Sequence, residues 1–142
     1  MKTFYLPTET DFMEPLHHLV DRLIPSFLPA ALRNHNFFIN DIPLDLPVEH
    51  NKEWVASIIS GMIATAVSNT RDNCIRFSAK KYGYVLVLEI QESGRVNNFP
   101  INADLLQIQG MAEKIGGCLF INTQKEEKII MSYSFPNLPV AA

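Results

Sequence analysis

Two pairs of β-type segments, separated by one helical segment, constrain the fold of this chain more than any other feature of its sequence. The four segments are rich in β-branched and aromatic residues and partly alternate apolar with polar side chains: 74–80, 84–92, 118–123 and 128–135. The short turns KKYG and QKEE join the members of each pair, so each pair predicts an antiparallel hairpin. Between the hairpins, an apolar stripe at helical spacing predicts a helix that ends at Gly116-Gly117. The stripe consists of Leu105, Ile108, Met111, Ala112 and Ile115.

Prolines divide the first helical region of the chain. Asp11 and Pro15 are suited to the start of a helix, where an acidic cap and a proline are both tolerated. Pro25 and Pro29 follow inside the same apolar periodicity, and a proline there removes a hydrogen bond and clashes with the preceding turn. We therefore expect a break, followed by a short second helical piece that runs through Leu32.

The longest predicted helix follows a short strand and a loop. Residues 36–42 are expected to form the strand, and the proline-punctuated residues 43–50 form the loop. Asn51 is a suitable N-cap for the helix, and Trp54 is expected to anchor the helix against a neighbouring element. The predicted apolar stripe contains Trp54, Val55, Ile58, Ile59, Met62, Ile63, Ala66 and Val67.

The resulting order is helix, strand, helix, hairpin, helix, hairpin. Antiparallel strands interrupted by helices predict an α+β fold, a two-layer sandwich with a mostly antiparallel sheet and helices packed on one face. The 142 residues suffice for one core, so residues 1–142 are assigned to a single domain.

Composition excludes several classes of function. The net charge is −3, and the 12 basic residues are scattered with only Lys80 and Lys81 adjacent, which argues against a nucleic-acid-binding face. No apolar run approaches the length of a membrane span, and the N-terminal residues lack a signal core. Cys74 and Cys118 are interpreted as buried thiols of a cytoplasmic protein, and the histidines have no spacing that indicates a metal site.

Four stretches, taken in this order, resemble the ATPase domain of sensor histidine kinases, the GHKL fold. INDIPLDLPVEHNKEWVASIISGMIATAVSNT is similar to the first strand, acidic-proline loop and long helix of that family. VLVLEIQESG resembles the strand that delivers the adenine-binding acid, and LLQIQGMAEKIGGCLFINT resembles the late helix, double glycine and following strand. KIIMSYSFPNLP is similar to the closing strand. The resemblance covers roughly residues 12–137 and implies a role in bacterial two-component signalling, with ATP and magnesium as ligands of active members.

The magnesium-binding position of the family is altered here. The asparagine that holds the magnesium falls on Thr65, a lysine-like position falls on Ser68, and a second asparagine falls on Gly61. A threonine hydroxyl is shorter than an amide and is aimed differently, so it is a weaker match for the metal. Asn69 is the one remaining amide expected on this helix face. Thr65 and Ser68 are therefore either altered ligands or small polar residues that line a vestigial groove.

The adenine-binding motif is partly kept. The family pattern of an acid followed by two alternating glycines is matched by Glu92, Gly94 and Val96, so the acid and the first glycine remain. The second glycine, which lets the backbone approach the nucleotide, is replaced. Glu92 is either the base-recognising acid of a weakened site or an exposed carboxylate at the end of a strand.

The family's long lid over the phosphates has no counterpart. Residues 95–102 connect the strand directly to the next helix. The positions of the phosphate-binding glycines match Asn102 and Asp104. Asn102 is expected to cap the helix with its own side chain, and Asp104 places a negative charge where a phosphate would bind, which opposes that binding by about 1 kcal/mol.

Three functions remain open from the sequence. The first is a degenerate, catalytically inactive kinase-like domain that binds a receiver domain or a histidine kinase, with a homodimer as a further option. The second is a divergent kinase domain that still binds ATP through Glu92 and Gly94. The third is a small-ligand sensor or a phosphotransfer partner that uses His17 or His18, although these histidines are interpreted first as a solvated helix face. No residue is assigned a catalytic role, and neither a cofactor nor a metal is expected in the first function.

Overall fold

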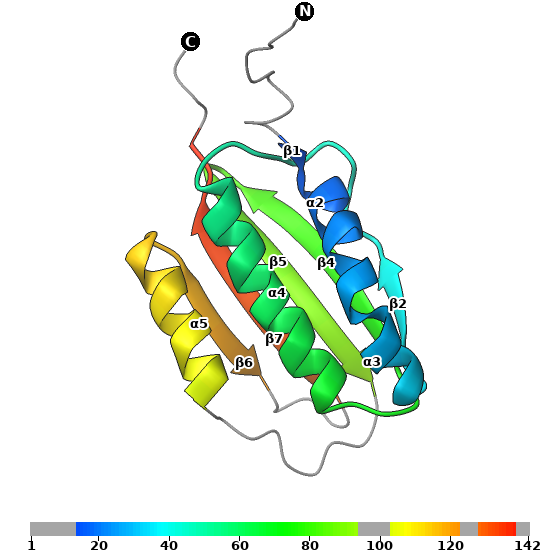
Figure 1. Cartoon of the computed structure of the whole chain (residues 1–142). Coiled ribbons are helices and arrows are strands. Elements are labelled where there is room, and N and C mark those ends of the chain that lie inside the picture. Colours follow the sequence, from blue (N-terminus) through cyan, green and yellow to red (C-terminus); the bar gives the residue numbers. More distant parts are fainter. Residues whose placement is uncertain (1–13, 94–102, 123–127, 139–142) are drawn as a thin grey trace, which may run out of the picture.

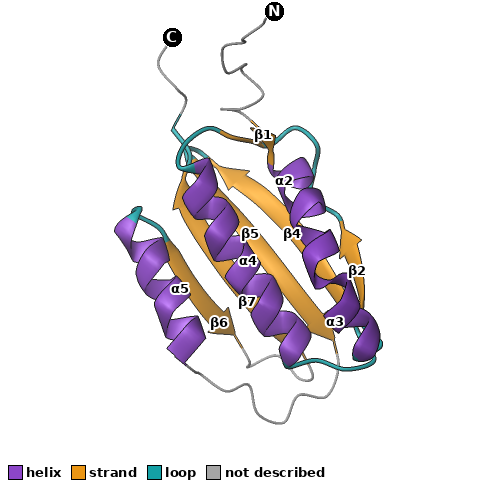
Figure 2. Cartoon of the chain, viewed as in Figure 1, coloured by secondary structure: helices purple, strands orange, loops and turns teal. Residues whose placement is uncertain are grey.

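A computed structural model of the chain describes residues 14–93, 103–122 and 128–138. Within these residues, five strands form one sheet in the order β2-β4-β5-β7-β6, and the helices cover one of its faces (Figures 1 and 2). The neighbours β2 and β4 are parallel, and the other pairs are antiparallel. The predicted α+β two-layer architecture is confirmed. The strands are β2 (Phe37–Asn40), β4 (Cys74–Tyr82), β5 (Val85–Ser93), β6 (Cys118–Asn122) and β7 (Lys128–Pro136).

The helical layer begins with a helix that the prolines break, as predicted. Helix α2 (Leu16–Leu23) passes into the 3-10 helix η1 (Ile24–Phe27), which is followed by α3 (Leu28–Arg33). Pro25 lies in the first turn of η1 and Pro29 in the first turn of α3, where the missing N–H groups have no helical partner to lose. Asp11, the expected cap, lies outside the described residues.

Helix α4 (Lys52–Ser68) crosses the middle of the sheet and supplies much of the core. Seven of its eight predicted apolar residues are buried, but the Trp54 side chain is 43% exposed, so the anchor predicted there is wrong. Trp54 lies on the helical row that continues through Ser57 and Gly61, and these two residues face α5 rather than the sheet. Asn51 adopts a left-handed conformation (φ 55°) and forms no side-chain cap, because an N-cap requires an extended backbone.

Helix α5 (Ala103–Lys114) packs beside α4 and over β6 (Figure 1). Gly61 permits this approach, since a Cβ atom at that position would lie 2.5 Å from Cγ2 of Ile108. Gly116, with φ 82°, ends the helix in the left-handed region as predicted. A Cβ atom on Gly117 would lie 2.5 Å from the carbonyl oxygen of Ser134, so this glycine lets the chain turn closely against β7.

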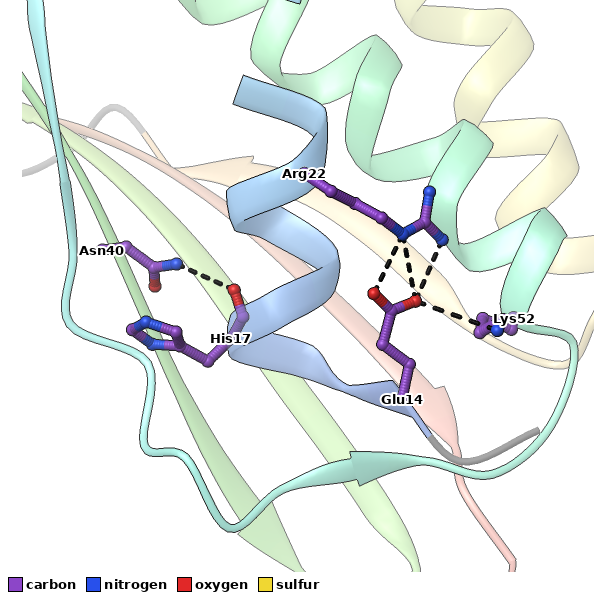
Figure 3. A network of polar contacts seen from close by, with 5 residues as sticks. All are labelled: Glu14, His17, Arg22, Asn40 and Lys52. Carbon is purple, nitrogen blue, oxygen red and sulfur yellow. Dashed lines mark hydrogen bonds and ion pairs between the residues drawn. The ribbon is translucent and has the colours of Figure 1, made fainter. Parts of the chain in front are cut away.

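The loop predicted at 43–50 contains a short strand that the sequence did not indicate. Strand β3 (Pro47–Val48) pairs with β1 (Glu14–Pro15) in a separate two-stranded sheet. Figure 3 shows the Glu14 carboxylate accepting hydrogen bonds from Arg22 at 2.9–3.1 Å, with Lys52 Nζ 3.9 Å from Oε1. These bonds raise the pKa of Arg22 and connect the first strand to α2 and α4.

The two cysteines are more accessible than predicted. Cys74 is half-buried, Cys118 is exposed, and both thiols are free. Both residues lie at the first position of a strand, and the alternation along β4 places Cys74 opposite the buried Ile75. Not every residue of an apolar strand is therefore buried, because helices cover only one face of this sheet.

Candidate functional site

A groove runs between α4 and α5 and contains several of the residues predicted from the sequence. Its volume is about 460 Å³. Helix α4 contributes polar and small residues, and α5 contributes one acid, one amide and two apolar side chains. The lining residues are Ser57, Gly61, Ala64, Thr65 and Ser68 from α4, and Asp104, Gln107, Ile108 and Met111 from α5.

The polar side chains at the magnesium-binding positions are bonded to their own helix. The Thr65 hydroxyl donates to the Gly61 carbonyl at 2.8 Å, and the Ser68 hydroxyl donates to the Thr65 carbonyl at 3.2 Å. The Asn69 amide also donates to the Thr65 carbonyl, at 2.8 Å. Such back-bonding satisfies the side chains within the helix and turns their donors away from the groove.

The electrostatics of the described part of the groove are negative. Asp104 lies in the first turn of α5, is exposed, and lines the groove opposite Thr65 and Ser68. None of the described lining residues is a lysine or an arginine. A triphosphate carries several negative charges and would find no basic partner among them, whereas Asp104 would repel it.

Glu92 is buried, which corrects the interpretation of this residue as an exposed carboxylate at a strand end. Its side chain is 1% exposed, and in register it lies between Ile75 of β4 and Ile129 of β7. Neither carboxylate oxygen has a hydrogen-bond partner among the described residues. Desolvation raises the pKa of Glu92 to about 8.

The alternation of β5 explains why Glu92 is buried. Leu86, Leu88 and Ile90 occupy every second position and are buried under the helices, and Glu92 continues that series. Glu92 does not line the α4–α5 groove. The structure therefore separates the predicted adenine-binding acid from the groove that Thr65 and Asp104 share.

The other predicted positions divide into three groups. Thr65, Ser68 and Asp104 come together in the groove, and Asn69 follows at the end of α4. Gly94 and Asn102 lie outside the described residues, as do residues 95–102, where the sequence predicts that the lid is missing.

Sequence reasoning missed Ser57 and Gln107 as lining residues of the groove. The helical spacing of the sequence could have indicated both residues. Ser57 precedes Gly61 by one turn, and Gln107 follows Asp104 by three residues, so each lies on the same face as a predicted site residue.

The histidine pair is only partly a solvated helix face. His18 is exposed, but His17 is half-buried and its Nδ1 atom donates to the carbonyl oxygen of Ile42 at 2.7 Å. Its Nε2 atom lies 3.3 Å from the carboxylate of Asp21. Figure 3 shows the same residue accepting a bond from Asn40 through its backbone carbonyl. His17 therefore joins α2 to β2 and to the loop that follows it.

This combination of a five-stranded mixed sheet, one helical layer and an α4–α5 groove is the fold of histidine kinase ATPase domains. The catalytic domain of the histidine kinase ThkA superimposes with a TM-score of 0.75 at 14% identity, over 90% of this chain and 97% of that chain. The histidine kinase AdeS of Acinetobacter baumannii superimposes with a TM-score of 0.76 at 12% identity, over 88% of this chain. A histidine kinase from Burkholderia phymatum gives a TM-score of 0.72 at 14% identity, over 88% of this chain and 70% of that chain.

No family model matches the chain, and no curated protein matches it. The chain spans 66% of AdeS and 42% of ThkA in its complex with the response regulator TrrA. The likeness therefore establishes the fold of one part of those kinases.

Within the described ranges, no helix is both long and apolar enough to cross a membrane. No cluster of three or more metal-binding side chains occurs in the same part of the chain.

Proposed function

We propose that this chain is a degenerate histidine-kinase-type ATPase domain that acts in bacterial two-component signalling by binding a partner protein, without hydrolysing ATP or transferring phosphate. The fold supports a kinase-like ATPase domain as the starting point. The free thiols of Cys74 and Cys118 are compatible with the reducing cytoplasm in which we propose that it works.

One observation carries the proposal. In the groove, the side chains at the magnesium-binding positions bond to the carbonyls of α4, and the charged lining residue of α5 is the acid Asp104. A magnesium triphosphate requires oxygen ligands that are aimed into the groove and positive charge around the phosphates. This arrangement supports a domain that has the helices and sheet of histidine kinase ATPase domains but has lost the ability to bind and hydrolyse ATP.

The partner that we propose is a receiver domain or another histidine kinase. Support comes from the structure of ThkA in complex with the response regulator TrrA, to which this chain is similar in fold. A homodimer is the second partner to test.

Calorimetric titration with magnesium ATP tests the loss of nucleotide binding. We expect no binding heat at millimolar ATP, because the described lining residues include a single carboxylate for the metal and no cation for the phosphates. ShkA, whose structure contains AMPPNP, is a suitable positive control for the same titration. Magnesium-dependent binding at millimolar affinity or tighter would refute the proposal.

The alternative is a divergent domain that still binds ATP through Glu92 and Gly94. It is supported by the retained acid and first glycine of the motif and by the Glu92 carboxyl, which has no hydrogen-bond partner among the described residues. Under this alternative, ATP raises the melting temperature of the unmutated chain, and Glu92→Ala abolishes the increase. An unmutated chain that ATP does not stabilise rules the alternative out.

A further inference from the structure

A second groove lies on the other side of α4, between that helix and the η1–α3 segment. Its volume is about 350 Å³. Among the described residues, its lining combines apolar side chains, two small polar ones and two cations. The apolar residues are Phe27, Ala30, Ala64 and Val67, the polar ones are Asn34 and Ser68, and the charged ones are Arg33 and Arg71. None of the lining residues that the structure describes is acidic. The groove therefore combines an apolar floor with two positive charges, which is the reverse of the charge in the α4–α5 groove.

Hydrogen bonds from asparagine side chains hold the two walls of this groove together. The Asn34 amide donates to the Val67 carbonyl at 2.8 Å, and the Asn36 amide donates to the Thr70 carbonyl at 2.8 Å. The Asp72 backbone N–H donates to the Asn34 carbonyl at 2.9 Å. These bonds link the end of α3 to the end of α4, so the groove is formed before any ligand arrives.

The two arginines are not needed to cap the helices that they follow. A cation near a helix C-terminus ordinarily interacts with unpaired carbonyl groups. Here the Asn69 backbone N–H donates to the Ala66 carbonyl, and the Asn69 side-chain amide donates to the Thr65 carbonyl. The Asn34 side-chain amide donates to the Val67 carbonyl. The carbonyls at the end of α3 likewise accept bonds from backbone N–H groups.

Neither arginine has a charged partner in the described structure. No ion pair or hydrogen bond joins the guanidinium group of Arg33 or Arg71 to a described residue. Asp72, which follows Arg71, lies 3.6 Å from His35 instead. Both guanidinium groups are thus available to an external anion, and their planar shape matches a phosphate or a carboxylate.

We propose that this groove binds a small organic anion, in which an apolar body of about one ring occupies the floor and a phosphate or carboxylate contacts Arg33 and Arg71. The volume is in the range of small-ligand sites, and the lining supplies both an apolar surface and two cations. This groove shares only Ala64 and Ser68 with the α4–α5 groove, and neither arginine lines that groove, so the inference does not depend on the proposed function.

Phenyl phosphate, phenol and inorganic phosphate are the probes that test the combination. Each is titrated into the isotope-labelled chain, and the NMR shifts of the Ala30 and Val67 methyl groups, which line this groove alone, and of the backbone around Arg71 are followed. We expect phenyl phosphate to bind at least about tenfold more tightly than either phenol or inorganic phosphate, because it alone uses both parts of the site. Equal binding of phenol or of inorganic phosphate, or no shifts with phenyl phosphate at millimolar concentration, would overturn the inference.

Charge-matched variants locate the contact. Arg33→Gln with Arg71→Gln removes two exposed cations from the groove, and Lys80→Gln with Lys81→Gln removes two from the far end of the β4–β5 hairpin. We expect the arginine variant to weaken phenyl phosphate binding about tenfold or more, and the lysine variant to leave it unchanged. Equal losses in both variants would show a nonspecific charge effect and overturn the assignment. Circular dichroism of each variant checks that its fold is intact. If a variant does not fold, the comparison of the three probes on the unmutated chain still tests the proposal.

Discussion

At the scale of single residues, Glu92 is the most consequential side chain in the molecule. The alternation of β5 places apolar side chains on the buried face of the strand, and the Glu92 carboxyl lies on that same face. It has no hydrogen-bond partner among the described residues. Burial of an ionised carboxylate in such a place costs several kcal/mol unless the group takes up a proton. Glu92 therefore prefers the neutral form in the folded chain at neutral pH.

This preference makes stability depend on pH in a defined interval. The unfolded chain releases the Glu92 proton near the ordinary pKa of 4.5, whereas the folded chain keeps it up to about 8. Because the folded state binds the additional proton between these values, its stability falls as the pH rises through the interval. We predict that Glu92→Gln raises the free energy of unfolding at pH 8 by roughly 3–5 kcal/mol and has little effect below the unfolded pKa.

Urea denaturation at a series of pH values measures this difference. Glu113→Gln, which removes a carboxylate from the exposed surface of α5, is the matched control and is expected to leave the pH profile unchanged. If Glu92→Gln and the unmutated chain lose stability in parallel between pH 5 and about 8, Glu92 is ionised in the folded state, and this account of its burial is wrong.

At the scale of secondary-structure elements, the close packing of α4 against α5 depends on one glycine. Gly61→Ala would place a methyl group 2.5 Å from Cγ2 of Ile108, which is attached to the branched Cβ and cannot swing away freely. We predict a net loss of about 1–2 kcal/mol, since overpacking outweighs the gain in helix propensity.

Gly110→Ala in α5 is the control for this change, because no atom lies within 4 Å of the added methyl group. It should stabilise the chain by about 0.5–1 kcal/mol through helix propensity alone. Thermal denaturation of both variants gives the signs directly. Stabilisation by both substitutions would show that the two helices can separate without cost.

The elements themselves were largely predictable, and the exceptions have physical causes. The hairpins, the proline break and the apolar stripe of α4 depend on local periodicity, which the sequence records directly. The exposure of Trp54 and the accessibility of Cys118 depend on which elements lie opposite them, and no local pattern contains that information. Strand β3 was missed because a pair of two-residue strands is too short for any periodicity.

At the scale of the whole molecule, Asn137 connects segments that are far apart in the sequence. Its side chain donates to the Pro47 carbonyl and accepts from the Glu49 N–H, each at 2.8 Å, and its backbone N–H donates to the Tyr84 carbonyl at 2.7 Å. The residue is 4% exposed. Two distant segments, residues 47–49 and Tyr84, thus bond to one residue beyond the end of β7.

We predict that Asn137→Ala lowers the free energy of unfolding by about 1–3 kcal/mol, because both side-chain hydrogen bonds of a buried group are lost. Chemical denaturation checks the size of the effect. The neighbouring Leu138→Ala, at an exposed position, should change stability by no more than about 0.5 kcal/mol. A similar small effect of Asn137→Ala would mean that water replaces both of its bonds.

The candidate site was predictable in part at this same scale. The family resemblance placed Thr65, Ser68 and Asp104 in one groove, and the structure brings them together. It did not predict that Glu92 would be excluded from that groove, since burial depends on how α4 and the neighbouring strands cover the end of β5. The basic groove between α3 and α4 was not predicted either, because Arg33 at the end of α3 and Arg71 beyond α4 line one groove only in the folded chain.

The short strand β3 contacts both the first and the last described segments of the chain. Pro47 pairs with Pro15 near the first described residue, and its carbonyl accepts a bond from Asn137 near the last. The first and last described segments therefore both contact strand β3. A short linker that joined these two segments would convert the chain into a ring with little change in the core. Such a ring could be opened at the exposed Gly83-Tyr84 turn, which would exchange the present ends for new ones while every strand kept its neighbour.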